Sequence, residues 1–158
     1  MLSSKYIRNL KNNEHSKLLQ RIIRDDLFRK LDITGINLKL NPKHYWSELF
    51  FTQKGILTNP KQLDFYEIIA QPDIVCLSNN PDYLIFTEVK LSNKPESIEE
   101  TKLQLQNYHN YVLNNPEFLI SFLEKEGIND NLIDHLSLGF LGVSKTRHGI
   151  KETYYFDF

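Results

Sequence analysis

Two apolar runs separated by a short polar turn form the clearest pattern along the chain. Ile74–Ser78 and Tyr83–Lys90 are rich in β-branched, aromatic and aliphatic residues, which is typical of strands. Between them lies Asn79-Asn80-Pro81-Asp82, a stretch of turn-forming residues. We therefore predict an antiparallel hairpin. Because apolar side chains would point to both of its faces, we expect it at the centre of a sheet that is covered on both sides.

Further patterns predict the elements around this hairpin. Helical spacing of apolar residues predicts helices over 14–31, 97–113 and 116–127, and apolar runs predict strands over 46–53, 63–69, 136–144 and 153–158. The apolar stripe of the second helix consists of Ile98, Leu105, Tyr108 and Val112. A chain of 158 residues is long enough to bury one sizeable core. We therefore predict a single α/β (α+β) domain over residues 1–158.

The register of the predicted hairpin brings two acidic residues together. If residues 79–82 form the turn, counting back along both strands sets Asp73 opposite Glu88. Since side chains alternate along a strand, Lys90 points to the same face. Opposed carboxylates destabilise a buried sheet unless a cation compensates them, so the pattern favours a divalent metal held by Asp73 and Glu88. In the structural alternative, Asp73 only starts a strand and Glu88 forms a salt bridge with Lys90.

These acids and the lysine resemble a known family motif. Pro72-Asp73 followed by Glu88-Val89-Lys90, with an apolar hairpin between them, resembles the PD-(D/E)XK nucleases. Downstream, Gln104-Leu105-Gln106-Asn107-Tyr108 is similar to the Gln-x-x-x-Tyr motif of the RecB-like branch. The resemblance covers residues 70–112 and implies a restriction-endonuclease-like fold, with a mixed central sheet flanked by helices. It also implies metal-dependent hydrolysis of DNA phosphodiester bonds, and no residue pattern indicates base recognition.

The resemblance implies a role for each residue of the centre. Asp73, Glu88 and the Val89 carbonyl would hold Mg²⁺ or Mn²⁺, which prefer oxygen ligands. Lys90 would orient or deprotonate the attacking water, or neutralise charge on the phosphate. A first-helix glutamate completes the metal site in many members, and Glu14 resembles it because it shares the apolar stripe of the first predicted helix. The alternative for Glu14 is a first-turn acid favoured by the helix dipole.

Gln104 and Tyr108 are neighbours on one helix surface because they are four residues apart. The resemblance implies that they position the nucleic acid strand as part of the catalytic site. A surface amide and a core aromatic are the alternatives for these two residues. The whole pattern also leaves two other functions open, an RNA nuclease and a non-catalytic nucleic-acid-binding protein on the same fold.

The charge of the chain is unevenly distributed. Its formal net charge is −1 at pH 7, yet residues 1–43 hold ten basic residues against four acidic ones. A basic segment beside an acidic centre suits a polyanion bound next to a metal. We therefore expect Lys17, Arg21 and Arg24 of the first helix to bind the nucleic acid backbone. A solvated helix face is the alternative.

The remaining composition restricts the class of protein. The single cysteine, Cys76, predicts neither a disulfide nor a zinc cluster, and the five histidines show no ligand spacing. No apolar run approaches the length of about 20 residues that a membrane span needs, and residues 1–5 lack a signal-peptide core. We therefore expect an intracellular protein. Size and motif are similar to a small nuclease of archaeal filamentous viruses, which implies an infected host cell, and the family implies a homodimer as one candidate assembly.

Overall fold

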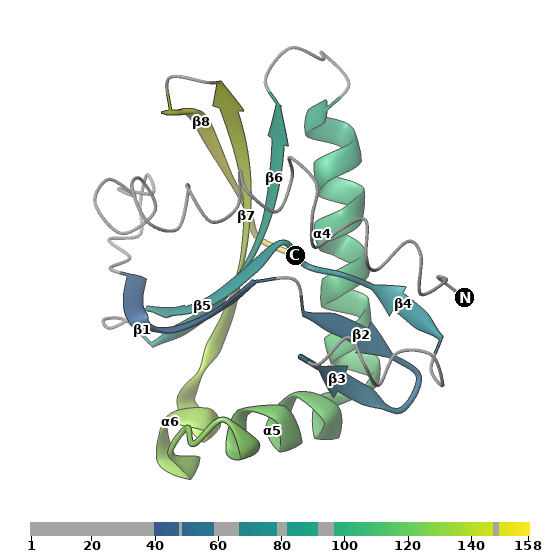
Figure 1. The fold of residues 1–158 in the computed structure, drawn as a ribbon, viewed down its shortest axis with the longest axis vertical. Helices are drawn as coiled ribbons and strands as arrows, with labels where there is room; N and C mark the ends of the chain where they lie inside the picture. The colour runs from purple at the N-terminus through teal and green to yellow at the C-terminus, as the bar shows by residue number, and fades with distance from the viewer. Residues whose placement is uncertain (1–39, 48, 59–66, 79–81, 92–96, 147–148) are drawn as a thin grey trace.

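The computed structural model describes residues 40–47, 49–58, 67–78, 82–91, 97–146 and 149–158 (Figure 1). In chain order its elements are β1 (Leu40–Ser47), β2 (Phe50–Thr52), β3 (Gly55–Leu57), β4 (Ile68–Ala70), β5 (Ile74–Ser78), β6 (Tyr83–Leu91), α4 (Ser97–Asn114), α5 (Pro116–Lys125), α6 (Asp130–His135), β7 (Ser137–Thr146) and β8 (Gly149–Phe156). None of the helices in these ranges is both long and apolar enough to cross a bilayer.

Five strands form a mixed sheet in the order β1-β5-β6-β7-β8, and a smaller sheet has the order β3-β2-β4. In the large sheet β6 and β7 are parallel, whereas the other neighbouring strands are antiparallel. Figure 1 shows α4 running along β6 and β7, with α5 and α6 at the end of the sheet where β7 begins. The structure confirms the prediction of a mixed α+β architecture.

The central hairpin has the register that the sequence predicts. Ile74 pairs with Thr87 and Leu77 with Leu84, so one further step along each strand sets Asp73 beside Glu88. On one face of the sheet, the side chains of β5 and β6 pack against α4 in a core that includes Val75, Leu77, Leu84, Phe86, Leu105 and Tyr108. Ile74, Cys76, Ile85 and Val89 point to the other face and are at most 2% exposed. Burial on both faces confirms that this is a central hairpin.

The strand predicted over 46–53 is wrong in its extent. β1 ends at Ser47, which pairs with Ile74 at the beginning of β5, so no further β5 residue is available for β1 to pair with. Phe50 and Phe51 are both buried, although adjacent strand residues face opposite ways. Phe51 enters the main core, whereas Phe50 packs in a separate cluster of the small sheet. The two aromatics are therefore buried on opposite faces of β2, which begins the small sheet.

Other predicted boundaries are close to the observed ones. The strand predicted over 63–69 corresponds in the described part to β4, Ile68–Ala70, and the two closing strands correspond to β7 and β8. α4 and α5 match the predicted helices. α6 was not predicted, because six residues are too few to show helical periodicity.

The predicted apolar stripe of α4 is wrong at its first position. Ile98 is 39% exposed, whereas Leu105, Tyr108 and Val112 are at most 5% exposed. Contact with the sheet begins one turn later, at Thr101, which is 4% exposed and lies against Gly142 of β7. Ile98 is therefore in the turn of the helix before the packed surface starts.

Candidate functional site

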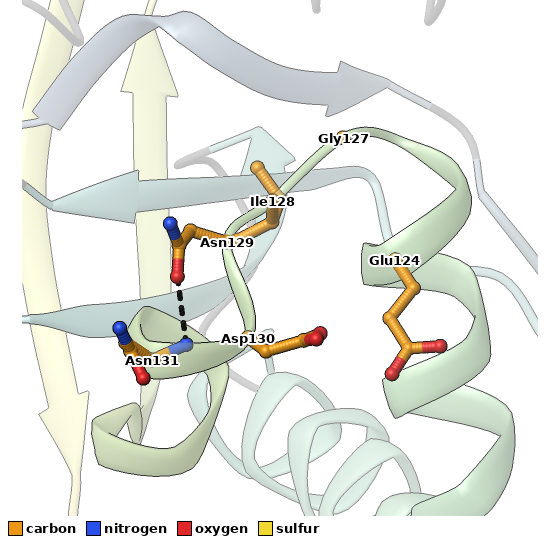
Figure 2. A pocket seen from close by; sticks show the side chains of 6 residues that line it. All are labelled: Glu124, Gly127, Ile128, Asn129, Asp130 and Asn131. Carbon is orange, nitrogen blue, oxygen red and sulfur yellow. Dashed lines mark hydrogen bonds between the residues drawn. The ribbon is translucent and has the colours of Figure 1, made fainter.

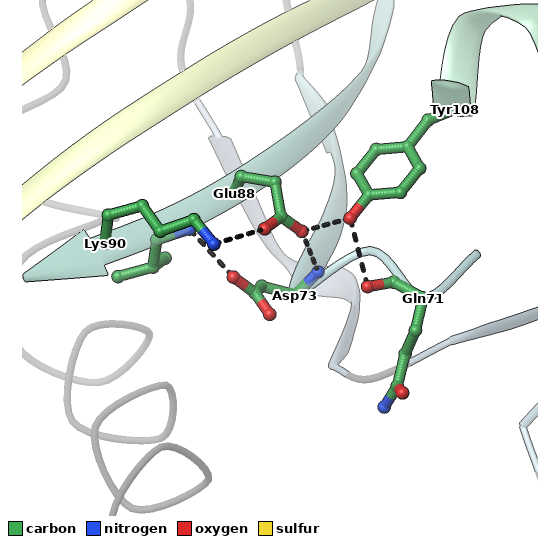
Figure 3. A network of polar contacts seen from close by, with 6 residues as sticks. Gln71, Asp73, Glu88, Lys90 and Tyr108 are labelled. Carbon is green, nitrogen blue, oxygen red and sulfur yellow. Dashed lines mark hydrogen bonds and ion pairs between the residues drawn. The ribbon is translucent and has the colours of Figure 1, made fainter. Parts of the chain in front are cut away.

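The two predicted metal-binding carboxylates come from neighbouring positions in the central hairpin. Asp73 directly precedes β5, and Glu88 lies in β6. The Asp73 amide donates a hydrogen bond to Glu88 Oε1 at 3.3 Å, and the Val89 amide donates one to Asp73 Oδ2 at 2.8 Å. Each carboxylate is therefore held by a backbone amide from the other residue's segment of the hairpin (Figure 3). Asp73 is 8% exposed and Glu88 is 3% exposed.

Lys90 completes the charged group on the same strand as Glu88. Its Nζ lies 3.9 Å from Glu88 Oε2, and its side chain is 29% exposed. Because Lys90 follows Glu88 by two residues, this ion pair runs along β6 and does not cross to β5. Lys90 is thus a partly exposed cation beside the nearly buried carboxylate of Glu88.

Tyr108 reaches the same centre from α4. Its hydroxyl contacts Glu88 Oε1 and also lies 3.1 Å from the Gln71 carbonyl oxygen. A tyrosine hydroxyl has one proton, so it donates to one of these acceptors at a time, and an ionised Glu88 is the stronger acceptor. The Tyr108 ring is buried in the core beside Phe51. The structure therefore matches the core-aromatic alternative for the ring, while the hydroxyl belongs to the site (Figure 3).

Gln104 lies one helical turn before Tyr108, but no hydrogen bond connects it to the carboxylates within the part of the chain that the structure describes. Its Oε1 is buried and has no hydrogen-bond partner there, which does not fit the surface-amide alternative. An acceptor that is buried without a donor destabilises the protein. A role for Gln104 in positioning a substrate stays a prediction.

Burial dominates the electrostatics of the pair. It raises the pKa of Glu88 well above the ordinary value of a glutamate, and the charge of Asp73 raises that pKa further. The hydrogen bond from Tyr108 and the charge of Lys90 oppose this shift without cancelling it. Burial and the neighbouring Glu88 likewise raise the pKa of Tyr108, which keeps its hydroxyl protonated as a donor. Burial and the charge of Asp73 therefore disfavour the ionised form of Glu88 in the metal-free protein.

The donor set suits a hard divalent cation. No cluster of three or more histidine, cysteine or acidic side chains occurs among the residues that the structure describes. Mg²⁺ commonly takes only one or two carboxylates and completes its shell with water, so Asp73 and Glu88 are the two described side chains that could hold it. The N–H and C=O groups of one strand residue point to the same edge, so the Val89 carbonyl is directed to the side of Asp73.

Four predicted site residues lie in a part of the chain that the structure does not describe. Glu14, Lys17, Arg21 and Arg24 all fall within residues 1–39, which the structure does not describe. Glu14 as a further metal ligand and the three basic residues as a nucleic acid surface therefore stay predictions.

One contributor to the site was missed in the sequence. The Gln71 carbonyl oxygen lies 3.1 Å from the Tyr108 hydroxyl as its second possible acceptor, and this contact joins α4 to the segment that leads into Asp73. A backbone carbonyl has no side-chain signal, because every residue has one. Its position directly before Pro72-Asp73 is the only sequence feature that could have drawn attention to it.

A surface hollow lies far from this centre. It is lined by Glu124, Gly127, Ile128, Asn129, Asp130 and Asn131, between α5 and α6 (Figure 2). Asn129 caps α6 by accepting a hydrogen bond from the Asn131 amide at 2.8 Å. β7 begins just after α6, and Gly142, the β7 partner of Glu88, is five residues further along, or about 17 Å at the rise of a strand. The hollow is therefore separate from the carboxylate pair.

Comparison of the chain with protein-family models, with curated proteins and with solved structures finds no match. What the protein does must therefore be inferred from the site itself.

Proposed function

We propose that this protein is a metal-dependent nuclease that hydrolyses DNA phosphodiester bonds with little sequence specificity. One observation carries the proposal. Asp73 and Glu88 are buried side by side at the end of a central hairpin, with Lys90 Nζ 3.9 Å from the outer carboxylate oxygen. A buried acid pair is costly without a cation, and a partly exposed lysine beside it is suited to an anionic substrate.

The proposal includes a restriction-endonuclease-like fold for this chain. A mixed sheet with the acidic hairpin at its centre and α4 packed on the hairpin is consistent with a restriction-endonuclease-like fold. The motif residues Asp73, Glu88 and Lys90 are near one another in this sheet, as the resemblance to the PD-(D/E)XK nucleases implies.

Asp73 and Glu88 would hold Mg²⁺ or Mn²⁺, together with the Val89 carbonyl. Such an ion, when bound, lowers the pKa of water and stabilises negative charge on the phosphate and the leaving oxygen. Glu88 would offer Oε2, because Oε1 accepts hydrogen bonds from the Asp73 amide and the Tyr108 hydroxyl. The fold would thus fix one oxygen of Glu88 and leave the other directed outward.

Lys90 would act on the reacting groups. Its ammonium would neutralise charge that develops on the phosphate or orient the attacking water, whereas its neutral amine would be the form that deprotonates the water. Tyr108 would act through Glu88, since its buried hydroxyl contacts that carboxylate and the Gln71 carbonyl. We therefore assign Lys90 a catalytic role and Tyr108 a positioning role.

A cleavage assay with matched variants tests the proposal. Circular and linear DNA and RNA are incubated with the protein and Mg²⁺, Mn²⁺ or a chelator, and the products are separated on a gel. We expect metal-dependent cleavage of DNA by the parent and none by Glu88→Ala. Glu99→Ala is the control, because Glu99 is an exposed acid in the first turn of α4.

The nucleic acid that is cleaved, or bound without cleavage, distinguishes the proposed DNA nuclease from its alternatives. Cleavage of RNA alone would indicate an RNA nuclease, and nucleic acid binding without cleavage would indicate a non-catalytic protein. If purified Glu88→Ala cuts DNA at the rate of the parent, the assigned site is wrong.

A further inference from the structure

A glycine of β7 lies directly beside the carboxylate centre. Gly142 is the partner of Glu88 in the parallel register of β6 and β7, and it faces α4. A Cβ atom at this position would lie 2.8 Å from Thr101 Cγ2 of α4 and 3.5 Å from Phe156 Cε2. Ordinary contact of a Cβ atom begins at about 3.4 Å. Helix α4 therefore approaches the sheet here at a distance that only glycine allows.

The contact at Thr101 has little freedom to relax. Thr101 is 4% exposed, and the methyl group of a β-branched residue is attached directly to Cβ with a restricted χ1. Apart from a change between the two χ1 rotamers that a helical threonine adopts, its methyl moves with the backbone of α4. A side chain at position 142 would push the helix away from β7 unless this methyl were rotated away or removed.

The position of α4 determines where the Tyr108 hydroxyl lies. Thr101 and Tyr108 are seven residues apart, close to two turns of about 3.6 residues, and so project from the same side of the helix. The Tyr108 hydroxyl spans Glu88 Oε1 and the Gln71 carbonyl, the latter at 3.1 Å. That distance is already at the long end for an O–H···O hydrogen bond. An outward shift of α4 would weaken the contact with Gln71 first.

We propose that Gly142 is a positioning residue, which lets α4 approach β7 closely enough for the Tyr108 hydroxyl to hold Glu88 and the Gln71 segment in place. The close approach rests on the geometry of the described residues alone. Its catalytic consequence rests on the proposed nuclease function.

A second glycine of the same strand provides a matched control. Gly139 lies on the opposite face of β7, where an added Cβ would be 3.3 Å from Tyr155 Cε2 and 3.5 Å from Tyr83 Cδ1. These atoms belong to ring side chains and not to α4. Gly139→Ala makes the same chemical change in the same strand without affecting the spacing between α4 and β7.

The first test compares Gly142→Ala, Gly139→Ala, Thr101→Ser and the double variant Gly142→Ala/Thr101→Ser in single-turnover DNA cleavage with Mg²⁺. Serine keeps the hydroxyl of Thr101 and removes only the methyl. We expect Gly142→Ala to lower the maximal single-turnover rate constant roughly ten- to a hundredfold, since a misplacement of about 1 Å can have that effect, with little change in the protein concentration that gives half of this rate. The double variant should recover most of the rate, and Gly139→Ala and Thr101→Ser should stay within about twofold of the parent.

The second test needs neither metal nor substrate. The amide signals of Asp73 and Val89, measured by nuclear magnetic resonance, report the two hydrogen bonds of the carboxylate pair. In Gly142→Ala these signals should shift and exchange faster with solvent, and in the double variant they should return to the parent positions. If the parent does not cleave nucleic acid but the amides respond in this way, the nuclease function fails and the positioning role of Gly142 stands.

Other outcomes would overturn the proposal. It is wrong if folded Gly142→Ala keeps both the cleavage rate and the two amide signals of the parent. It is also wrong if the double variant recovers nothing, because Thr101 would then not be the obstacle. Should Gly142→Ala fail to fold, recovery of folding in the double variant supports the close approach and continued failure contradicts it.

Discussion

Glu88 is held differently at its two carboxylate oxygens. Oε1 accepts from the Tyr108 hydroxyl and the Asp73 amide, whereas Oε2 faces the Lys90 ammonium at 3.9 Å. The first set of contacts comes from buried groups, and the second comes from a partly exposed side chain. A single carboxylate can therefore be fixed by the fold and still present an oxygen to a ligand.

Glu88→Gln should raise the thermal stability of the metal-free protein at neutral pH. Burial and Asp73 raise the pKa of Glu88, so below the ordinary glutamate pKa of about 4.3 the carboxyl is neutral in both the folded and unfolded states. As pH rises, the unfolded chain ionises first, and the folded parent loses stability until pH passes the folded-state pKa. The melting-temperature difference should be smallest near about pH 4 and should grow towards neutral pH. A difference that is constant with pH would contradict the raised pKa.

Tyr108→Phe should affect both stability and turnover. It removes the donor to Glu88 and keeps the ring packing, so we expect a loss of about 1–3 kcal/mol in the free energy of unfolding, the cost of leaving a buried acceptor without its donor. Cleavage should fall roughly ten- to a hundredfold, since Glu88 loses one anchor. Denaturant unfolding and single-turnover rates per folded molecule measure the two effects.

Tyr111→Phe is the matched control for this variant. Tyr111 is also buried on α4, but its hydroxyl donates to the Thr52 carbonyl of the small sheet at 2.7 Å. Its removal should cost about 0.5–1.5 kcal/mol and leave cleavage unchanged. Equal turnover in both variants would mean that Tyr108 has no special role in the site.

At the scale of elements, the end of α5 shows how local chemistry stops a helix. Gly127 follows the helix with φ +83°, a conformation that side chains other than glycine rarely adopt. The Ile128 amide donates to the Leu123 carbonyl and the Gly127 amide to the Glu124 carbonyl, both at 3.0 Å. These two bonds form a Schellman motif, in which buried Ile128 and Leu123 supply the usual apolar contact.

Gly127→Ala should lower the free energy of unfolding by about 1–2 kcal/mol, the cost of a left-handed conformation for an ordinary residue. Nothing lies within 4 Å of an added Cβ there, so strain is the sole cause. Gly127→Asn should cost less, because asparagine tolerates this conformation better. Denaturant unfolding of the three proteins provides the test, and equal stability of alanine and asparagine variants would contradict it. Cleavage should not change, since α5 is remote from Glu88.

At the scale of the whole molecule, acidic and basic residues are unevenly distributed along the chain. Helices α4, α5 and α6 carry six acidic residues against two lysines, so their exposed surfaces repel a polyanion. The basic residues are concentrated in residues 1–43. If the protein binds nucleic acid, we expect affinity to depend on this segment and turnover to depend on the carboxylate centre.

Charge reversal at Arg21 and Arg24 should weaken DNA binding and reduce the slope of log affinity against log salt by about 2, since each phosphate contact contributes about 0.9. Lys90→Ala should do the opposite, losing turnover while keeping most of the affinity, because one ammonium is a small part of a multi-phosphate contact. Binding titrations at two salt concentrations, run beside single-turnover cleavage, measure both. If both sets of variants changed DNA affinity and turnover to the same extent, binding and cleavage would not depend on separate residues.

The sequence by itself determined the features that depend on neighbouring residues. The turn-forming residues at 79–82 and the alternation of side chains predicted the register that brings Asp73 to Glu88, and helical periodicity with Pro116 and Gly127 bounded α4 and α5. Such signals are local, because turn chemistry and side-chain period depend on residues only a few positions apart.

Only the tertiary structure decided how distant segments meet. The contact of Tyr108 with Gln71 spans 37 residues, and the close approach of Thr101 to Gly142 joins a helix to a strand 41 residues later. The division of 46–53 between two sheets depends on where β5 begins and on separate pockets for Phe50 and Phe51. These outcomes follow from close packing, in which each side chain takes the space that the others leave, and no local pattern in the sequence records that space.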